Sequence, residues 1–199
     1  MNEAILEPVL RRMRIRQVLP IIRQYHDCVL LDIGCGWDAK FLQSVEAYVS
    51  KAEGIDSRAP PIHTQKLSTR RITLTESLPY ANEAFDVVTM LAVLEHLSHP
   101  RAVITEVFRI LKPGGRLVLT VPSNAAKPVL EFLAFRLGIV NAAEIRDHKC
   151  YYNKGLLHHL LANTGLMMEI HHYFQLGMNN FVVCAKQSDP ANAVSDPEA

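Results

Sequence analysis

Apolar residues along the chain fall into short continuous runs that are separated by stretches with helical spacing. The runs predict five strands, at Val29–Ile33, Ala52–Asp56, Arg71–Thr75, Phe85–Met90 and Arg116–Val121. Apolar side chains three and four positions apart predict helices over residues 2–24, after Gly36, from Pro100 to the Pro113–Gly115 turn, and between Asn153 and Gly165. Strands that alternate with helices are typical of an α/β fold with a parallel sheet.

The last third of the chain departs from this alternation. Residues 123–150 contain a helical run at 126–140 with apolar groups on more than one face, including Phe132 and Phe135. Such a helix is expected either to cover the mouth of a cleft, to pack on a partner, or to serve as a crossover helix on the sheet. Two final strands follow, at Leu166–Phe174 and Asn180–Ala185.

The same pattern divides the chain into an N-terminal helical segment, a main domain and a tail. We expect the helical segment over residues 1–27 and the main domain over 28–186, with 123–150 as its lid or acceptor region. Within the first helix, Pro20 is expected to begin a fresh turn. Residues 187–199 are polar, contain proline and lack periodicity, so they are expected to be disordered.

Composition narrows the possible partners. The 199 residues are 49% hydrophobic and 21% charged, which suits one ordinary globular core. The net charge of +1 and the lack of a basic block argue against a nucleic acid as partner. No run is long enough to span a membrane, and Glu3 and Glu7 make a signal peptide improbable. The four cysteines show no C-x-x-C spacing, so we expect reduced thiols in a cytoplasmic protein: Cys28, Cys35, Cys150, Cys184.

Candidate chemistry begins where the first strand ends, at Gly34-Cys-Gly36. Glycine lets the backbone turn tightly and approach a ligand closely, and the next helix points free N–H groups over the turn. Asp56 ends the second strand twenty residues later, where a βαβ nucleotide site places a carboxylate on ribose hydroxyls. Both a dinucleotide dehydrogenase and an S-adenosylmethionine (SAM) methyltransferase are compatible with this spacing.

Two carboxylates next to the turn favour the methyltransferase. Asp32 precedes the first glycine and Asp38 follows the second. A pyrophosphate would be repelled there, whereas the sulfonium and ammonium of SAM would be attracted. Ala39 occupies the third glycine position of the dinucleotide fingerprint, which tolerates alanine.

The ordered set of motifs resembles class I SAM-dependent methyltransferases over residues 28–186. The similarity is to the small-molecule branch, which includes the ubiquinone-biosynthesis type (methyltransferase type 11). The motifs are Leu31-Asp-Ile-Gly-Cys-Gly36, Gly54-Ile-Asp56, Leu78-Pro79, Phe85-Asp-Val-Val88, Val93-Leu-Glu-His96 and Leu111-Lys-Pro-Gly-Gly115. The resemblance implies a single-domain, Rossmann-like, doubly wound fold with a mostly parallel seven-stranded sheet and an antiparallel last strand. It also implies SAM as cofactor and a small-molecule acceptor. The sequence does not reveal the oligomeric state, and a homodimer is one possibility.

The resemblance assigns cofactor contacts to five positions: Asp32, Gly34, Gly36, Asp56, Leu91. In the family an acid usually ends the third strand and bonds the adenine amino group; counting back from Leu78–Pro79 places Leu74 there. Adenine would then be held by backbone and apolar contacts, unless the register of that strand differs.

Two histidines are candidates for a general base, His148 and His96. The pair Glu95–His96 could equally serve to steady its loop. Some relatives hold a divalent metal with Glu-x-x-Glu-His, but Ala92 occupies the first of those positions, so no metal is expected. Asp38 and Leu74 keep open a degenerate module that binds SAM or a partner without catalysis. A different SAM reaction on the same scaffold also stays open.

Overall fold

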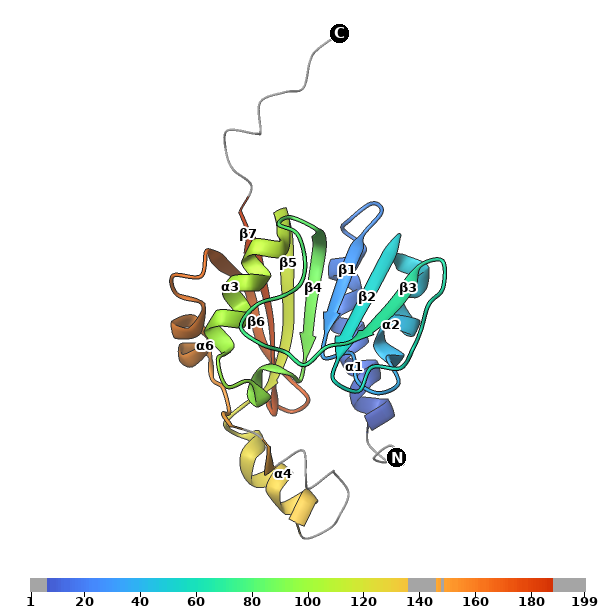
Figure 1. Ribbon diagram of the computed structural model, residues 1–199. Coiled ribbons are helices and arrows are strands. Elements are labelled where there is room, and N and C mark those ends of the chain that lie inside the picture. Colours follow the sequence, from blue (N-terminus) through green and yellow to red (C-terminus); the bar gives the residue numbers. More distant parts are fainter. Residues whose placement is uncertain (1–6, 136–145, 148, 188–199) are drawn as a thin grey trace.

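The computed structural model describes residues 7–135, 146–147 and 149–187 (Figure 1). Its centre is one seven-stranded sheet in the order β3-β2-β1-β4-β5-β7-β6. The strands are β1 Val29–Ile33, β2 Lys51–Asp56, β3 Leu67–Arg71, β4 Phe85–Leu91, β5 Leu111–Pro122, β6 Leu166–Phe174 and β7 Asn179–Lys186. Strands β1 to β5 pair in parallel, and β7 is antiparallel to both of its neighbours. The expected Rossmann-like sheet with a reversed last strand is confirmed.

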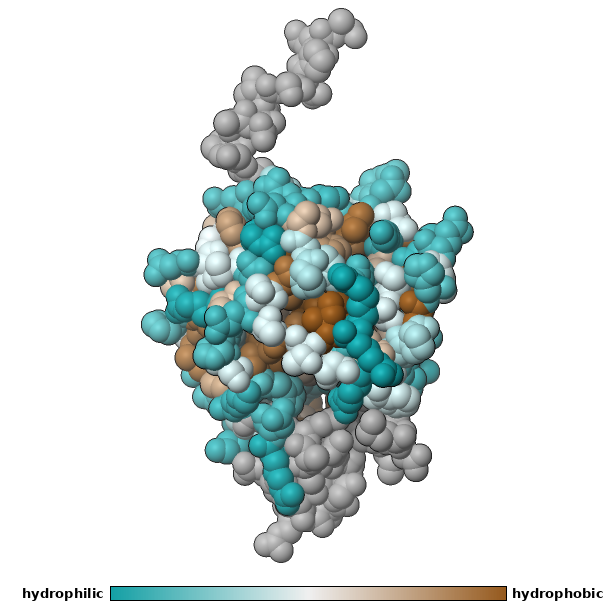
Figure 2. Space-filling model, viewed as in Figure 1, coloured by the Kyte–Doolittle hydropathy of each residue, from teal (hydrophilic) through white to brown (hydrophobic). Residues whose placement is uncertain are grey.

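Helices cover both faces of this sheet (Figure 1). They are α1 Glu7–Ile22, α2 Lys40–Val45, α3 Pro100–Ile110 and α6 Lys154–Leu161, whereas α4 Ala126–Phe135 projects from one end of the sheet; 3₁₀ turns are η1 Glu46–Tyr48 and η2 Leu94–His96. One apolar core lies between the sheet and α3 and α6, and a second lies between the sheet and α1 and α2. In Figure 2, hydrophilic residues cover most of the face in view, and hydrophobic residues show between them.

Local sequence explains where the covering helices begin. Pro100 stands in the first turn of α3, where its missing N–H costs no hydrogen bond. The side chain of Asn153 caps α6 by accepting a hydrogen bond from Leu156 N at 2.9 Å. One face of each helix is buried, as the apolar spacing predicts.

The third strand lies four residues earlier than the prediction of Arg71–Thr75. Leu67–Arg71 pairs with Ala52–Asp56 of β2, and the chain leaves the sheet after Arg71. The apolar side chains of Ile72 and Leu74 pack against the core from a loop instead of from the sheet. Their alternation therefore reflects loop packing, and Leu74 does not end β3.

Two other element boundaries also differ from the prediction. Helix α1 continues through the exposed Pro20 to Ile22 instead of starting afresh there, and Arg23 N still bonds to Leu19 O at 3.1 Å. Strand β5 begins at Leu111, so Pro113–Gly115 belongs to the strand and not to the end of α3. The register shift between Phe85 and Val87 of β4 accommodates this entry into the sheet.

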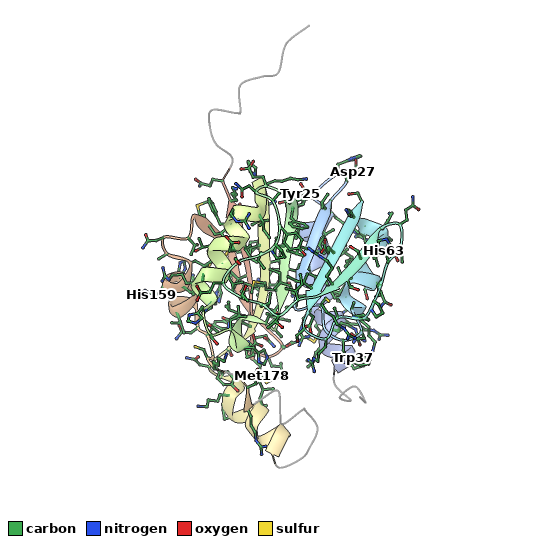
Figure 3. The ribbon with its side chains drawn as sticks, viewed as in Figure 1. Tyr25, Asp27, Trp37, His63, His159 and Met178 are labelled. Carbon is green, nitrogen blue, oxygen red and sulfur yellow. The ribbon has the colours of Figure 1, made fainter. Side chains whose placement is uncertain are left out.

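The carboxyl ends of the parallel strands meet at one edge of the sheet, which we call the carboxyl edge. The antiparallel β7 starts there, since Asn179 pairs with Pro122 at the end of β5. Figure 3 shows Trp37 and Met178 at this end of the molecule and Tyr25 and Asp27 at the opposite end. Ligands of open α/β sheets bind at the carboxyl edge.

Candidate cofactor and acceptor site

The turn after β1 is held closely against its neighbours. Gly34 has a φ of +79°, and its N–H donates to Ile55 O of β2 at 2.7 Å. A Cβ added at Gly34 would lie 2.3 Å from Cγ2 of Val93, in the loop after β4. Glycine is therefore required here for both its conformation and its lack of a side chain.

Gly36 is required for a different reason. Its φ is +75°, yet an added Cβ would meet only Oδ1 of Asp38, at 3.9 Å. The backbone at Gly36 thus borders open space, where a ligand can approach it. The N–H of Gly36 donates to Oδ2 of Asp56 at 3.2 Å, which ties this turn to the end of β2.

Asp56 is half-buried at the end of β2, and its second oxygen, Oδ1, accepts the N–H of Arg58 at 2.7 Å. These two backbone bonds orient the carboxylate. A carboxylate has about four acceptor positions, so two hydroxyl donors can still be accommodated.

Asp32 lies beneath the same turn and is only 2% exposed. Its Oδ1 accepts the hydroxyl of Thr89, its register partner on β4, at 2.6 Å. The pKa of Asp32 is raised to about 7, chiefly by burial; the Thr89 hydrogen bond acts against this rise, and the nearby charge of Asp56 contributes to it. A cation next to Asp32 would favour its ionised form, so this carboxyl suits a positively charged ligand.

The loop after β4 begins at Leu91, which is half-buried, and continues through Ala92 at a φ of +60°. Glu95 in this loop is 1% exposed, and its Oε2 has no hydrogen-bond partner among the described residues. Burial raises its pKa to about 7, and the charges of His96 and of Arg14 on α1 act in the opposite direction. The charge of this carboxyl thus depends on a residue of helix α1 as well as on its own loop.

A distant segment, residues 149–152, crosses the same loop, and we call it the strap. Lys149 N donates to Glu95 O and Lys149 Nζ donates to Ser98 Oγ, both at 2.8 Å. Just before the strap, Asp147 Oδ2 lies 2.9 Å from Nδ1 of His96. At its other end, Tyr152 N donates to Pro122 O at 3.0 Å. This side of the edge is thus assembled from segments far apart in the chain, and we call it the acceptor side because the expected acceptor region, 123–150, adjoins it.

The structure brings together five of the expected site residues at this edge: Asp32, Gly34, Gly36, Asp56, Leu91. His96 lies beside them, whereas His148 and residues 188–199 of the expected tail lie outside the described residues. Asp38, which we expected to add negative charge, forms an ion pair with Lys40 at 3.1 Å. Within the described part of the chain, no cluster of three or more His, Cys, Asp or Glu residues could hold a metal ion.

Sequence reasoning missed two contributors: Thr89 and Asp147. Thr89 could have been found from the parallel register, because the strand next to β1 must place some residue opposite Asp32. Asp147 reaches the edge only through tertiary packing, and nothing in its local sequence marks it.

Comparison with known proteins gives a consistent result. A family model described as "Methyltransferase domain" matches residues 10–170. Ubiquinone biosynthesis O-methyltransferase of Dechloromonas aromatica is 31% identical over 110 residues, covering 51% of this chain and 47% of that protein. The uncharacterized protein YafE of Escherichia coli is 32% identical over 133 residues, covering 66% and 63%. The chain thus spans about half to under two thirds of these relatives.

Solved structures show the same fold. A putative methyltransferase from Bacillus halodurans superposes with a TM-score of 0.68 at 15% identity, over 87% of this chain and 99% of that one. At this identity the likeness concerns the fold alone.

Proposed function

The chain belongs to the methyltransferase-domain family of class I SAM-dependent methyltransferases, and we propose that it transfers a methyl group from SAM to a small-molecule acceptor. The arrangement of Gly36 and Asp56 carries this proposal. Open space borders the backbone of Gly36, and an oriented carboxylate stands beside it. A nucleoside with free ribose hydroxyls matches both features.

In the proposed complex, the carboxylate of Asp56 accepts hydrogen bonds from the ribose hydroxyls. The buried Asp32 supplies negative charge beneath the methionine part, and Leu91 contributes an apolar contact at the end of β4. No acid follows β3 directly, since Ile72 to Thr75 are uncharged. Adenine would therefore be held by apolar groups and backbone atoms.

Methyl transfer from a sulfonium needs an electron-rich acceptor atom in line with the breaking carbon–sulfur bond. Positioning supplies most of the rate for such a reaction. An acceptor hydroxyl would also need a base, which adds about 10²–10⁴-fold. We propose His96 for that role, since an N–H at Nδ1 would donate a hydrogen bond to Asp147, which would hold the imidazole ring in a fixed orientation. His148, next in the chain to Asp147, is the second candidate.

The acceptor would bind between the loop after β4 and the segment 123–150. That segment leaves β5 at the carboxyl edge, and α4 projects from the body of the molecule at that end (Figure 1). We propose that it forms a lid that excludes water from the transfer. The strap, held by Lys149 and Tyr152, would anchor the lid.

Two experiments test this function. A thermal-shift panel with SAM, S-adenosylhomocysteine and NAD should show stabilisation by the first two compounds only. Incubation of the purified protein with methyl-labelled SAM and a metabolite extract should then label a small molecule. Replacing Phe132 and Phe135 by alanine should reduce labelling much more than SAM affinity.

The runner-up function is a binding module without catalysis, which the uncharged stretch after β3 favours. The binding-module function would be favoured over methyl transfer by two results together. The protein would bind SAM tightly without labelling any extract, and one protein partner would be recovered with it in stoichiometric amount. Stabilisation by NAD alone would overturn the cofactor class.

A further inference from the structure

The turn between β6 and β7 carries a leucine in an unfavourable setting. Leu176 is 98% exposed and has a φ of +57°, between Gln175 at +52° and Gly177 at +84°. The left-handed region costs a branched side chain energy that glycine or asparagine would avoid. Full exposure also means that the side chain contributes nothing to the core. Neither packing nor backbone geometry explains a leucine at this position.

Two other exposed apolar side chains lie on segments that are joined to this turn by hydrogen bonds. Gln175 Nε2 donates to Leu10 O of α1 at 3.5 Å, and the neighbouring Val9 is 54% exposed. On the other side, Ser123 Oγ donates to Gly177 O at 2.7 Å, just before α4, where Val129 is 40% exposed. We call the three side chains the apolar rim: Val9, Val129, Leu176.

Basic residues accompany the rim. Val9, Arg12 and Arg16 are exposed and are separated by three and seven positions, so they share one face of α1. Lys127, in the first turn of α4, is exposed as well. Asp38 at the same end is paired with Lys40, and Asp147 stays exposed beside His96, which would cancel its charge only when protonated. The carboxyl edge therefore presents apolar tips together with exposed positive charge.

We infer that the apolar rim and the basic face of α1 dock the carboxyl edge of the protein onto an anionic lipid surface. Apolar side chains that enter the headgroup region next to cationic ones are the features by which peripheral proteins bind membranes. The rim side chains come from three separate segments, so they do not form one continuous apolar surface. A lipid surface is fluid and can accommodate separate side chains, whereas a protein partner would need a matching groove for each of them. No helix among residues 7–135, 146–147 and 149–187 could cross a membrane, so the contact would be peripheral. The inference goes beyond the proposed methyl transfer and does not depend on it.

The test uses the full chain and sedimentation with vesicles. Vesicles of phosphatidylcholine and phosphatidylglycerol should bind the protein, and vesicles of phosphatidylcholine alone should bind it weakly. Leu176→Asn should weaken binding about tenfold, because it removes one apolar side chain from the contact. Arg12→Gln or Arg16→Gln should each weaken it about fivefold, and added salt should reduce that difference.

Controls separate docking from folding and from cofactor binding. Asparagine suits a positive φ better than leucine, so Leu176→Asn should keep or raise the melting temperature, and Leu176→Gly serves as a second variant. Met167→Gln removes a side chain that is 47% exposed at the start of β6, at the other end of the strand, and should bind vesicles like the wild type. Lys51→Gln, at the start of β2, is the matching charge control. SAM affinity should be unchanged in all of these variants.

Wild-type vesicle affinity in both Leu176 variants would overturn the inference. So would equal binding to neutral and anionic vesicles, or the lack of binding to either. If the wild type instead forms dimers that Leu176→Asn dissociates, without vesicle binding, the rim is a contact between two copies of the chain. A failure of vesicle binding with normal SAM binding would leave the proposed methyl transfer untouched.

Discussion

The two halves of the carboxyl edge are built in different ways. On the cofactor side, the turn after β1 is positioned by backbone groups of neighbouring strands, such as the bond from Gly34 N to Ile55 O. On the acceptor side, side chains such as His96 and Asp147 join segments about fifty positions apart. A site built from adjacent strands follows from the fold itself. A site built from a loop and a strap can change its shape without changing the sheet, which suits the half that must select the acceptor.

The largest expected difference between the halves comes from Gly34→Ala. The added Cβ would meet Val93 at 2.3 Å and would have to keep a φ of +79°. Clash and strain together should lower the free energy of unfolding by about 2–4 kcal/mol and abolish SAM binding. Denaturant unfolding and calorimetry measure the two effects.

The double variant Gly34→Ala with Val93→Ala is the control for the clash. It should recover part of the lost stability, since only the strain at φ +79° is left. A stable single variant with normal SAM affinity would show that the turn is not the cofactor site.

Asp56→Ala should act on the cofactor alone. Loss of the ribose hydrogen bonds should weaken SAM about a hundredfold, near 2.7 kcal/mol. Water can replace the acceptor for Gly36 N and Arg58 N at this half-buried position, so unfolding should change by less than about 1 kcal/mol. Asp56→Asn keeps one acceptor oxygen, so its SAM affinity in a calorimetric titration should lie between those of the wild type and of Asp56→Ala. Unchanged affinity in Asp56→Ala would remove the carboxylate from the site.

The cofactor side could be predicted from the sequence, and the acceptor side could not. The Gly34–Gly36 turn and Asp56 can be recognised from the sequence alone. A tight turn directly after a strand favours glycine, and an acid at the end of the next strand is a local pattern that needs no knowledge of tertiary packing. The effect of a Gly34 substitution on the fold, by contrast, depends on the position of Val93, which comes from tertiary packing.

Strand β3 shows a second limit of sequence reasoning. Apolar residues alternate with polar ones at Ile72 and Leu74, and this pattern is the same for a strand and for a loop that packs on the core. The pattern therefore led to a strand prediction four residues later than the observed β3. On the acceptor side, Asp147 contacts His96 only because the strap crosses the loop, and no local rule encodes that crossing.

Glu95→Gln tests the buried carboxyl on the acceptor side through pH. Its pKa is raised from 4.5 to about 7, so the folded state favours the protonated form. Its contribution to stability is complete below pH 4.5 and is lost as the pH rises to about 7. The variant should therefore be more stable than the wild type at pH 8, by about 3 kcal/mol at most, and should show a flatter pH dependence.

Glu106→Gln is the matched control with the opposite sign. Arg109 lowers the pKa of Glu106, so its stabilising effect is present above the ordinary carboxyl range and is lost on acidification. That variant should lose stability at neutral pH. If Glu95→Gln also lost stability at neutral pH, the carboxylate of Glu95 would be stabilising in its charged form, and its pKa would not be raised in the folded protein.

The smallest expected effect lies in the contact that joins the loop after β4 to the start of the strap. Asp147 is 65% exposed and His96 28%, so the pair should contribute no more than about 0.2–1 kcal/mol to stability. Asp147→Asn should therefore leave unfolding and SAM affinity nearly unchanged. If His96 is the base, the loss of the carboxylate that orients it should lower kcat several-fold and shift the pH profile of kcat. His96→Gln should lower kcat further, whereas Lys149→Gln, which removes only the bond to Ser98, should mainly affect the acceptor KM. If Asp147→Asn has the kcat and the pH profile of the wild type, the pair only holds the start of the strap to the loop after β4. The base would then be another residue on the acceptor side.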